Sequence, residues 1–104
     1  MNLEDSVAEG LQSFQNGDIE AAESIFLNVL QEQPKHPQAL HGKSLVLHSR
    51  GDRTGARLAL VEAISVSPHV AGYHNNLGCI LFEEGEDEEA QTAFYRALKI
   101  DPTL

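Results

Sequence analysis

The side chains best suited to metal binding or nucleophilic chemistry in this chain are five histidines and a single cysteine. His41 and His48 are two helical turns apart, roughly 10 Å by the rise of an α-helix, which is too far for both rings to hold one ion. No Cys-x-x-Cys or His-Glu-x-x-His spacing occurs. The sequence therefore predicts no metal site and no cofactor. We interpret the histidines as solvated residues or as the edge of a binding groove: His36, His41, His48, His69 and His74.

Catalysis has no better support than metal binding. Cys79 has no histidine and acid at a spacing that would make it a nucleophile, and such a cysteine is more often a small buried hydrophobic residue. No glycine-rich phosphate loop or paired-carboxylate motif is present, since the acidic residues are scattered along the chain. The sequence therefore predicts a protein that is not an enzyme.

Composition narrows the classes of partner. A formal net charge of −9 argues against nonspecific nucleic-acid binding, which requires a basic surface. No run of eighteen apolar residues predicts membrane insertion, and the first residues do not resemble a secretory signal, so a cytoplasmic location is favoured. The net charge is −6 over residues 3–36, +2 over 37–70 and −5 over 71–104. The basic middle third is either a steering field for a partner or a solvated helical surface.

The elements that would position these side chains follow from a repeat of 34 residues that occurs three times. A fixed period of this length is typical of stacked repeats, in which each unit contacts only its neighbours. Four columns keep the register: Gly10, Ser44 and Gly78; Gly17, Gly51 and Gly85; Ala22, Ala56 and Ala90; Pro34, Pro68 and Pro102.

Each repeat is predicted to contain two helices, because apolar residues recur every three or four positions on both sides of a central glycine. In the first repeat, Gly17 suits a left-handed helix end and Asp18 suits the cap of the next helix. Proline closes each unit. The expected helices cover residues 3–15, 19–30, 38–49, 54–66, 71–84 and 88–100.

These columns resemble the tetratricopeptide repeat, whose signature over 34 residues is W-x2-L-G-x2-Y, then A-x3-F, then P. The third unit is most similar, with Leu77-Gly78, Ala90, Phe94 and Pro102 in place. The resemblance implies an all-α, right-handed superhelical solenoid of three antiparallel helix pairs. It further implies a non-catalytic module that binds a peptide or partner helix in a concave groove lined by the first helix of each pair. The signature departs most in the first half, where its tryptophan is replaced by Ser6 and Leu40, and its leucine by Glu9 and Lys43.

By the same resemblance, the groove residues are those of the first helices that the packing columns leave over. Apolar side chains with polar edges suit an extended peptide or an amphipathic helix. Leu11, Phe14 and Leu45 have an alternative role as filling between repeats, whereas groove exposure is favoured for His41, His48 and Asn75. The full set is Val7, Leu11, Phe14, His41, Leu45, His48, Asn75, Cys79 and Phe82.

Two ligand classes of this family fit poorly. The lysine, arginine and asparagine clamp that holds a C-terminal carboxylate in chaperone-binding members would fall on positions including Val7, Leu45 and Cys79. An asparagine ladder like that of the sugar-transferase relatives is represented only by Asn76, with Ala8 and Gly42 at the equivalent positions.

We therefore expect one tetratricopeptide-repeat domain over residues 1–104, with repeats at about 3–36, 37–70 and 71–104, acting in protein–protein interaction. An accessory domain of a larger enzyme, such as a sugar or sulfate transferase, and a self-assembling scaffold are the alternatives. The chain ends at a repeat boundary without a polar capping unit, so a weak homodimer through the helix at 88–100 is also expected. Finally, Glu9 and Lys43 occupy equivalent positions in adjacent units, which predicts an ion pair between them.

Overall fold

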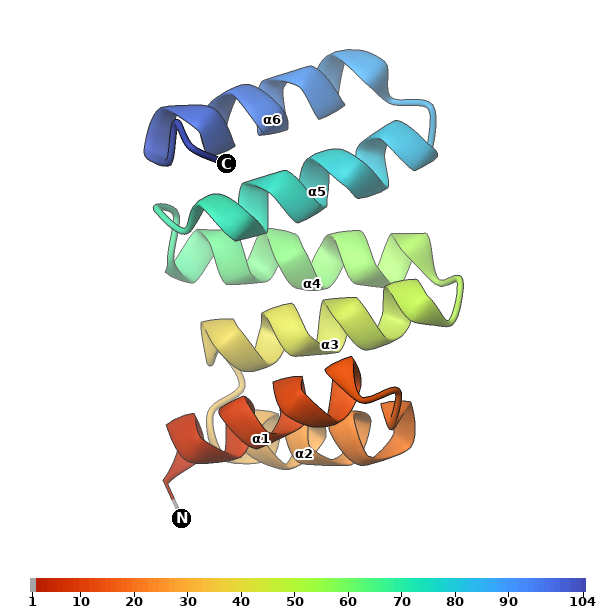
Figure 1. Ribbon diagram of the computed structural model, residues 1–104, viewed down its shortest axis with the longest axis vertical. Coiled ribbons are helices and arrows are strands. Elements are labelled where there is room, and N and C mark those ends of the chain that lie inside the picture. The colour runs from red at the N-terminus through yellow and green to blue at the C-terminus, as the bar shows by residue number, and fades with distance from the viewer. Residues whose placement is uncertain (1) are drawn as a thin grey trace.

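The predicted all-α architecture is confirmed by a computed structural model, which describes residues 2–104. Met1, the first residue of the predicted domain, lies outside the described residues. Short turns connect antiparallel neighbours and stack three helix pairs along the long axis (Figure 1). The six helices of the described chain are α1 (Leu3–Gln15), α2 (Ile19–Glu32), α3 (Pro37–Ser49), α4 (Arg53–Val66), α5 (Ala71–Glu83) and α6 (Asp87–Ile100).

Local sequence explains where the helices begin and end. Gly17, Gly51 and Gly85 have φ values of 86°, 84° and 82°, a left-handed conformation that glycine adopts without steric cost. Asp18 and Asp52 cap the second helices of their pairs by accepting backbone hydrogen bonds from Ala21 and Gly55. The equivalent Glu86 makes no such bond, and α6 instead begins with three acidic residues, which the helix dipole favours.

The two helices of a pair approach closely at a small residue on the first helix. A Cβ added to Gly10 would lie 2.7 Å from the ring of Phe26, and one added to Gly78 would lie 2.6 Å from Phe94. The middle repeat has Ser44 at this position, and its partner is Leu60, a smaller side chain than phenylalanine. Ser44 and Leu60 are 2% and 0% exposed. The glycine and aromatic columns therefore hold the pairs together by steric fit.

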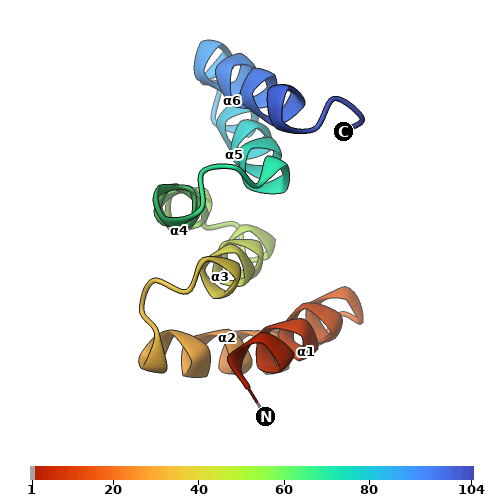
Figure 2. The ribbon, with the colours of Figure 1, turned by 90° about the vertical axis from the view of Figure 1, so that its left-hand side faces the viewer.

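The pairs stack because each first helix packs on the second helix of the preceding pair. α3 packs on α2, and α5 packs on α4, so the core is continuous from one end of the stack to the other. α1 and α3 also touch, and Figure 2 shows α3 and α4 offset from each other as the stack turns. Within residues 2–104, no helix has the length and apolar content needed to cross a bilayer.

Ion pairs join neighbouring repeats near the turns. Arg50, which follows α3, binds Glu23 of α2, and Arg57 of α4 binds Glu84, which follows α5, at 3.0 Å. The predicted pair between Glu9 and Lys43 is wrong: in the described part of the chain neither side chain forms an ion pair. Lys43 instead faces a small hollow beside Glu23 and Leu27.

Candidate functional site

The surface where the predicted groove residues gather runs along α3 and α5. We call it the inner face and define it by Leu45, His48, Cys79 and Phe82. Its centre is a hollow of about 210 Å³. Three of the predicted groove residues line this hollow: Leu45, His48 and Cys79. Four residues that were not predicted as groove residues also line it: Ser44, Leu60, Asn76 and Ile80.

The hollow exists because the second interface is filled less completely than the first. At the first interface, Phe26 reaches the next repeat, where a Cβ added to Gly42 would lie 2.4 Å from the ring. At the second interface, the residue equivalent to Phe26 is Leu60, and the residue equivalent to Gly42 is Asn76. The shorter leucine leaves room for the asparagine side chain and for the hollow beside it.

His41 forms one polar edge of this surface, and its ring is largely withdrawn from water. The His41 Nε2 atom lies 2.9 Å from Asn76 Nδ2, so the amide donates a hydrogen bond when that ring nitrogen is unprotonated. The ring also lies against Tyr73, with the centroids 5.1 Å apart. Burial lowers the pKa of His41 below its usual value and raises that of Tyr73. Both groups are therefore held in their neutral forms.

The other polar edge is charged and open to solvent. His48 Nε2 lies 2.6 Å from Glu83 Oε1, and each side chain is 38% exposed. This contact joins α3 to α5 directly, so the second and third repeats are linked across the inner face. Phe82, one residue before Glu83, is 64% exposed and supplies a large apolar side chain at the rim.

The predicted residues of the first repeat are placed differently. Val7 is only 3% exposed and belongs to the first core cluster, so its prediction as a groove residue is wrong. Leu11 and Phe14 are half-buried and pack against that cluster, which corresponds to their alternative role as filling between repeats. Asn75 is half-buried on α5, next to Asn76.

The interpretation of the histidines as solvated or groove-edge residues is wrong for two of them. His36 is 8% exposed and caps α3, because its Nδ1 atom accepts the backbone N–H of Ala39 at 3.3 Å. His74 is 5% exposed, and its Nε2 atom lies 2.7 Å from the carbonyl oxygen of Pro68. Cys79 is exposed, unlike the small buried residue that a free cysteine more often is.

Within residues 2–104, no group of three or more histidine, cysteine, aspartate or glutamate side chains is arranged to hold a metal ion. The inner face therefore offers apolar surface, hydrogen-bonding groups and one exposed contact between a histidine and a carboxylate. Such an arrangement suits recognition of another chain.

The fold and the sequence together define a helical-repeat protein of the class that mediates protein interactions. The chain belongs to the tetratricopeptide repeat family, whose profiles match residues 7–64 and 71–104. Domains of this family generally bind protein or peptide partners and are typically not catalytic.

Curated relatives include segments of much longer proteins. The chain is 31% identical over 84 residues to the human Protein O-mannosyl-transferase TMTC3, and the aligned region covers 78% of this chain and 9% of that protein. It is 35% identical over 71 residues to TPR repeat-containing protein PA4299 of Pseudomonas aeruginosa, covering 68% of this chain and 29% of that protein. The chain thus spans less than a third of the length of these relatives.

Solved structures share the arrangement of the helices. A Thermobaculum terrenum O-GlcNAc transferase mutant has a TM-score of 0.92 and 30% identity, over 96% of this chain and 19% of that one. The first tetratricopeptide domain of Spaghetti (RPAP3), bound to an HSP90 peptide, has a TM-score of 0.88 and 16% identity, over 98% of this chain and 81% of that one. The latter identity is low, so that likeness concerns the fold alone.

Proposed function

We propose that the inner face binds an extended peptide or a partner helix. The observation that supports this proposal best is the hollow between α3 and α5, which is lined by Leu45, His48 and Cys79. Phe82 and Asn75 extend the same surface along α5. On this proposal the three helix pairs act as one interaction domain.

The chemistry of the surface indicates what kind of ligand fits. An apolar floor takes an apolar anchor side chain, and Asn76, whose side-chain nitrogen contacts His41, brings an amide oxygen to the hollow that can accept a hydrogen bond from a peptide backbone. A ligand that approaches Glu83 meets a carboxylate that already contacts His48, so a basic ligand residue would have to compete for it.

A C-terminal carboxylate is not the expected ligand. The positions at which chaperone-binding members carry clamp residues are occupied here by Val7, Leu11, Leu45 and Cys79. Val7 is also buried. We therefore expect anchoring through apolar side chains, unlike the clamp that the family resemblance describes.

The test uses peptides selected from a displayed random library on the intact chain, with affinities measured by fluorescence anisotropy. In the variant with His48→Glu and Phe82→Glu, two carboxylates are placed on the inner face. We expect peptides that bind this face to lose at least about tenfold in affinity, because apolar contact is removed and charges are desolvated.

The matched control adds the same charge elsewhere. Thr54→Glu and Leu58→Glu both alter exposed residues of α4, outside the hollow. This control should bind as the unaltered chain does, and circular dichroism should show equal helicity for all three proteins. The proposal would be contradicted if every selected peptide bound the folded His48→Glu, Phe82→Glu variant as tightly as the unaltered chain.

Two other functions are supported by specific observations. Similarity to segments of an O-mannosyl-transferase and an O-GlcNAc transferase supports a role as an accessory domain of a transferase. The complete coding sequence would decide this, since it would show whether a catalytic domain is attached. Self-association is supported by Tyr95 and Leu98 of α6, which are 61% and 47% exposed.

A further inference from the structure

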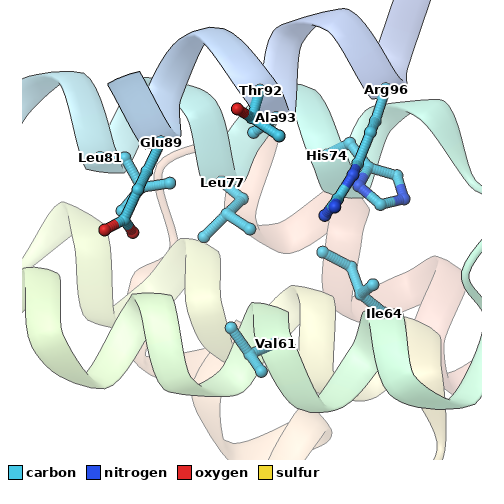
Figure 3. A pocket seen from close by; sticks show the side chains of 9 residues that line it. All are labelled: Val61, Ile64, His74, Leu77, Leu81, Glu89, Thr92, Ala93 and Arg96. Atoms are coloured by element: carbon cyan, nitrogen blue, oxygen red, sulfur yellow. The ribbon is translucent and has the colours of Figure 1, made fainter. Parts of the chain in front are cut away.

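A second groove lies on the opposite side of the stack from the inner-face hollow, between α4 and α6. Both helices pack on α5, which forms the floor, whereas in the described chain they form no extensive contact with each other. Two adjoining hollows of about 310 and 360 Å³ lie in this space, and Ile64, His74 and Arg96 line both of them. We call their combined surface the outer groove. Figure 3 shows its first part, with Val61 and Ile64 on α4 facing the side chains of α6.

The outer groove is specific to the second interface. At the first interface, the hollow lined by the equivalent residues Leu27, Lys43 and Leu47 is only about 40 Å³ and lies between α2 and α3. Lys43 lines that smaller hollow, and the equivalent residue in the outer groove is Leu77. The tetratricopeptide repeat therefore does not require a large groove at every interface. The outer groove results from residues that are particular to the second and third repeats.

The two ends of the outer groove carry opposite charges. Glu89 lies at one end, and Arg96, Lys99 and His69 line the other. Glu89 and Lys99 are ten residues apart on α6, which separates the two ends by roughly 15 Å along the helix. That length accommodates four or five extended residues or a short helix.

The two cations at the basic end, Arg96 and Lys99, form no ion pair within the described part of the chain. The chain has only seven lysines and arginines against sixteen acidic residues. Arg50 and Arg57, in contrast, form ion pairs between repeats. Lys99 lies over the Tyr95 ring, 5.4 Å from its centroid.

Apolar surface is open between these charged ends. Val61 is 48% exposed on one wall, and Ile100 is 36% exposed near the basic end. The ring of His74 lines both hollows and is held in place by its contact with the Pro68 carbonyl. Apolar walls with a cationic end are complementary to an amphipathic segment that carries anionic groups at one end.

We infer that the outer groove docks a short acidic amphipathic segment of a partner protein, with its apolar side chains against Val61, Ile64 and Leu77. Its acidic residues lie beside Arg96 and Lys99, and Glu89 repels the opposite orientation. This surface is separate from the inner face, so one chain has two independent docking sites.

The test selects peptides from a displayed random library on the full chain and sorts them by the variants that abolish their binding. Peptides of the outer groove should contain apolar residues next to a cluster of aspartate or glutamate. They should lose about tenfold in affinity with Arg96→Glu and Lys99→Glu, and they should also bind more weakly to Val61→Glu. They should retain binding to the His48→Glu, Phe82→Glu variant, and their affinity should fall with rising salt.

The matched control is the variant with Lys35→Glu and Arg53→Glu, which makes the same change in charge at exposed residues outside the outer groove. An equal loss in this control would mean that the total charge, not the groove, governs binding, and that would overturn the inference. The inference also fails if no enriched peptide depends on both Arg96 and Val61. It fails as well if the groove variants change only the mass of the chain in solution, since a second copy would then be the occupant.

Discussion

At the scale of single residues, the size of the small residue on the first helix of a pair matches that of its partner on the second. Glycine faces phenylalanine in the outer two repeats, at Gly10 and Gly78, whereas Ser44 faces Leu60 in the middle one. The Ser44 hydroxyl donates to the carbonyl oxygen of His41 at 2.7 Å, so its polar group is satisfied although the side chain is buried. The combined volume of the two facing side chains is therefore similar in all three repeats, although it is divided differently between the two helices.

Gly78→Ala should therefore destabilise the chain. The added Cβ would lie 2.6 Å from the ring of Phe94, so the ring must move, and overpacking of this kind costs roughly 1–3 kcal/mol. Gly72→Ala on the same helix is the control, since nothing lies within 4 Å of the added atom. It should stabilise by up to about 1 kcal/mol, because glycine is a poor helix former.

Urea denaturation measures both changes. Adding Phe94→Leu to Gly78→Ala gives a small side chain opposite a leucine, as at Ser44 and Leu60, and it should recover part of the loss. If Gly78→Ala proves as stable as Gly72→Ala, then steric fit does not hold this pair together.

Residue-scale predictions from the sequence succeeded where backbone geometry decides and failed where neighbouring repeats decide. The left-handed conformation of Gly17 and the cap at Asp18 were predicted because they depend on local chemistry. The burial of Val7 was not predicted, since α3 and α2 cover it only after stacking. Nor was the hollow beside Asn76, which results from Leu60 of one repeat being shorter than Phe26 of another.

At the scale of helices, the two arginine–glutamate pairs that join neighbouring repeats occupy equivalent positions, but the acid and the base have exchanged places. Glu23 and Arg57 are 34 residues apart, and so are their partners Arg50 and Glu84. The first interface thus has an acid on its second helix, and the second interface has a base there. Incorrect stacking of repeats would bring like charges together, so the exchanged pairs favour the native order.

Reversing one partner should show this effect. Glu23→Arg places two cations together and should destabilise the chain, whereas Glu23→Arg with Arg50→Glu should restore most of the stability. Since the side chains are about 35–42% exposed, the coupling energy should be no more than about 1 kcal/mol. A double-mutant cycle by urea denaturation gives the coupling.

The same cycle at the second interface provides a comparison. Arg57 and Glu84 are less exposed, at 33% and 21%, so their coupling should be at least as large. A coupling energy of zero at both interfaces would mean that these pairs do not contribute to the order of the repeats.

At the scale of the whole molecule, the repeated sequence made the fold predictable, but the first and last helices differ in the polarity of their outward-facing positions. The 34-residue columns predicted six helices and their order, and the structure confirms them. The positions by which α3 and α5 pack on the preceding repeat carry mainly apolar or large residues, but the equivalent positions of α1 are Ser6, Glu9 and Ser13. In contrast, the position of Leu30 in α2 and Ile64 in α4 is still apolar in α6, where Leu98 occupies it.

This asymmetry predicts how the chain self-associates. No described helix covers Tyr95 and Leu98, which are 61% and 47% exposed. The polar residues of α1 fit this surface poorly, so head-to-tail stacking is disfavoured, and two copies of α6 are expected to pair around a two-fold axis. Burial of about 400 Å² of apolar surface stabilises by roughly 10 kcal/mol. Association costs roughly 4–15 kcal/mol, so the dimer should be weak.

Light scattering over a hundredfold range of concentration tests this prediction. The mass should rise with concentration, and more so in high salt, because residues 71–104 carry a net charge of −5 that repels a second copy. Leu98→Glu should give a monomer at every concentration, since it places a carboxylate at the centre of the contact. Leu58→Glu is the matched control, because Leu58 is 54% exposed on α4, away from α6, and it should leave the mass unchanged. A monomeric mass for the unaltered chain at the highest concentration and salt would show that α6 does not drive association, and that its exposed leucine is compatible with a single copy in solution.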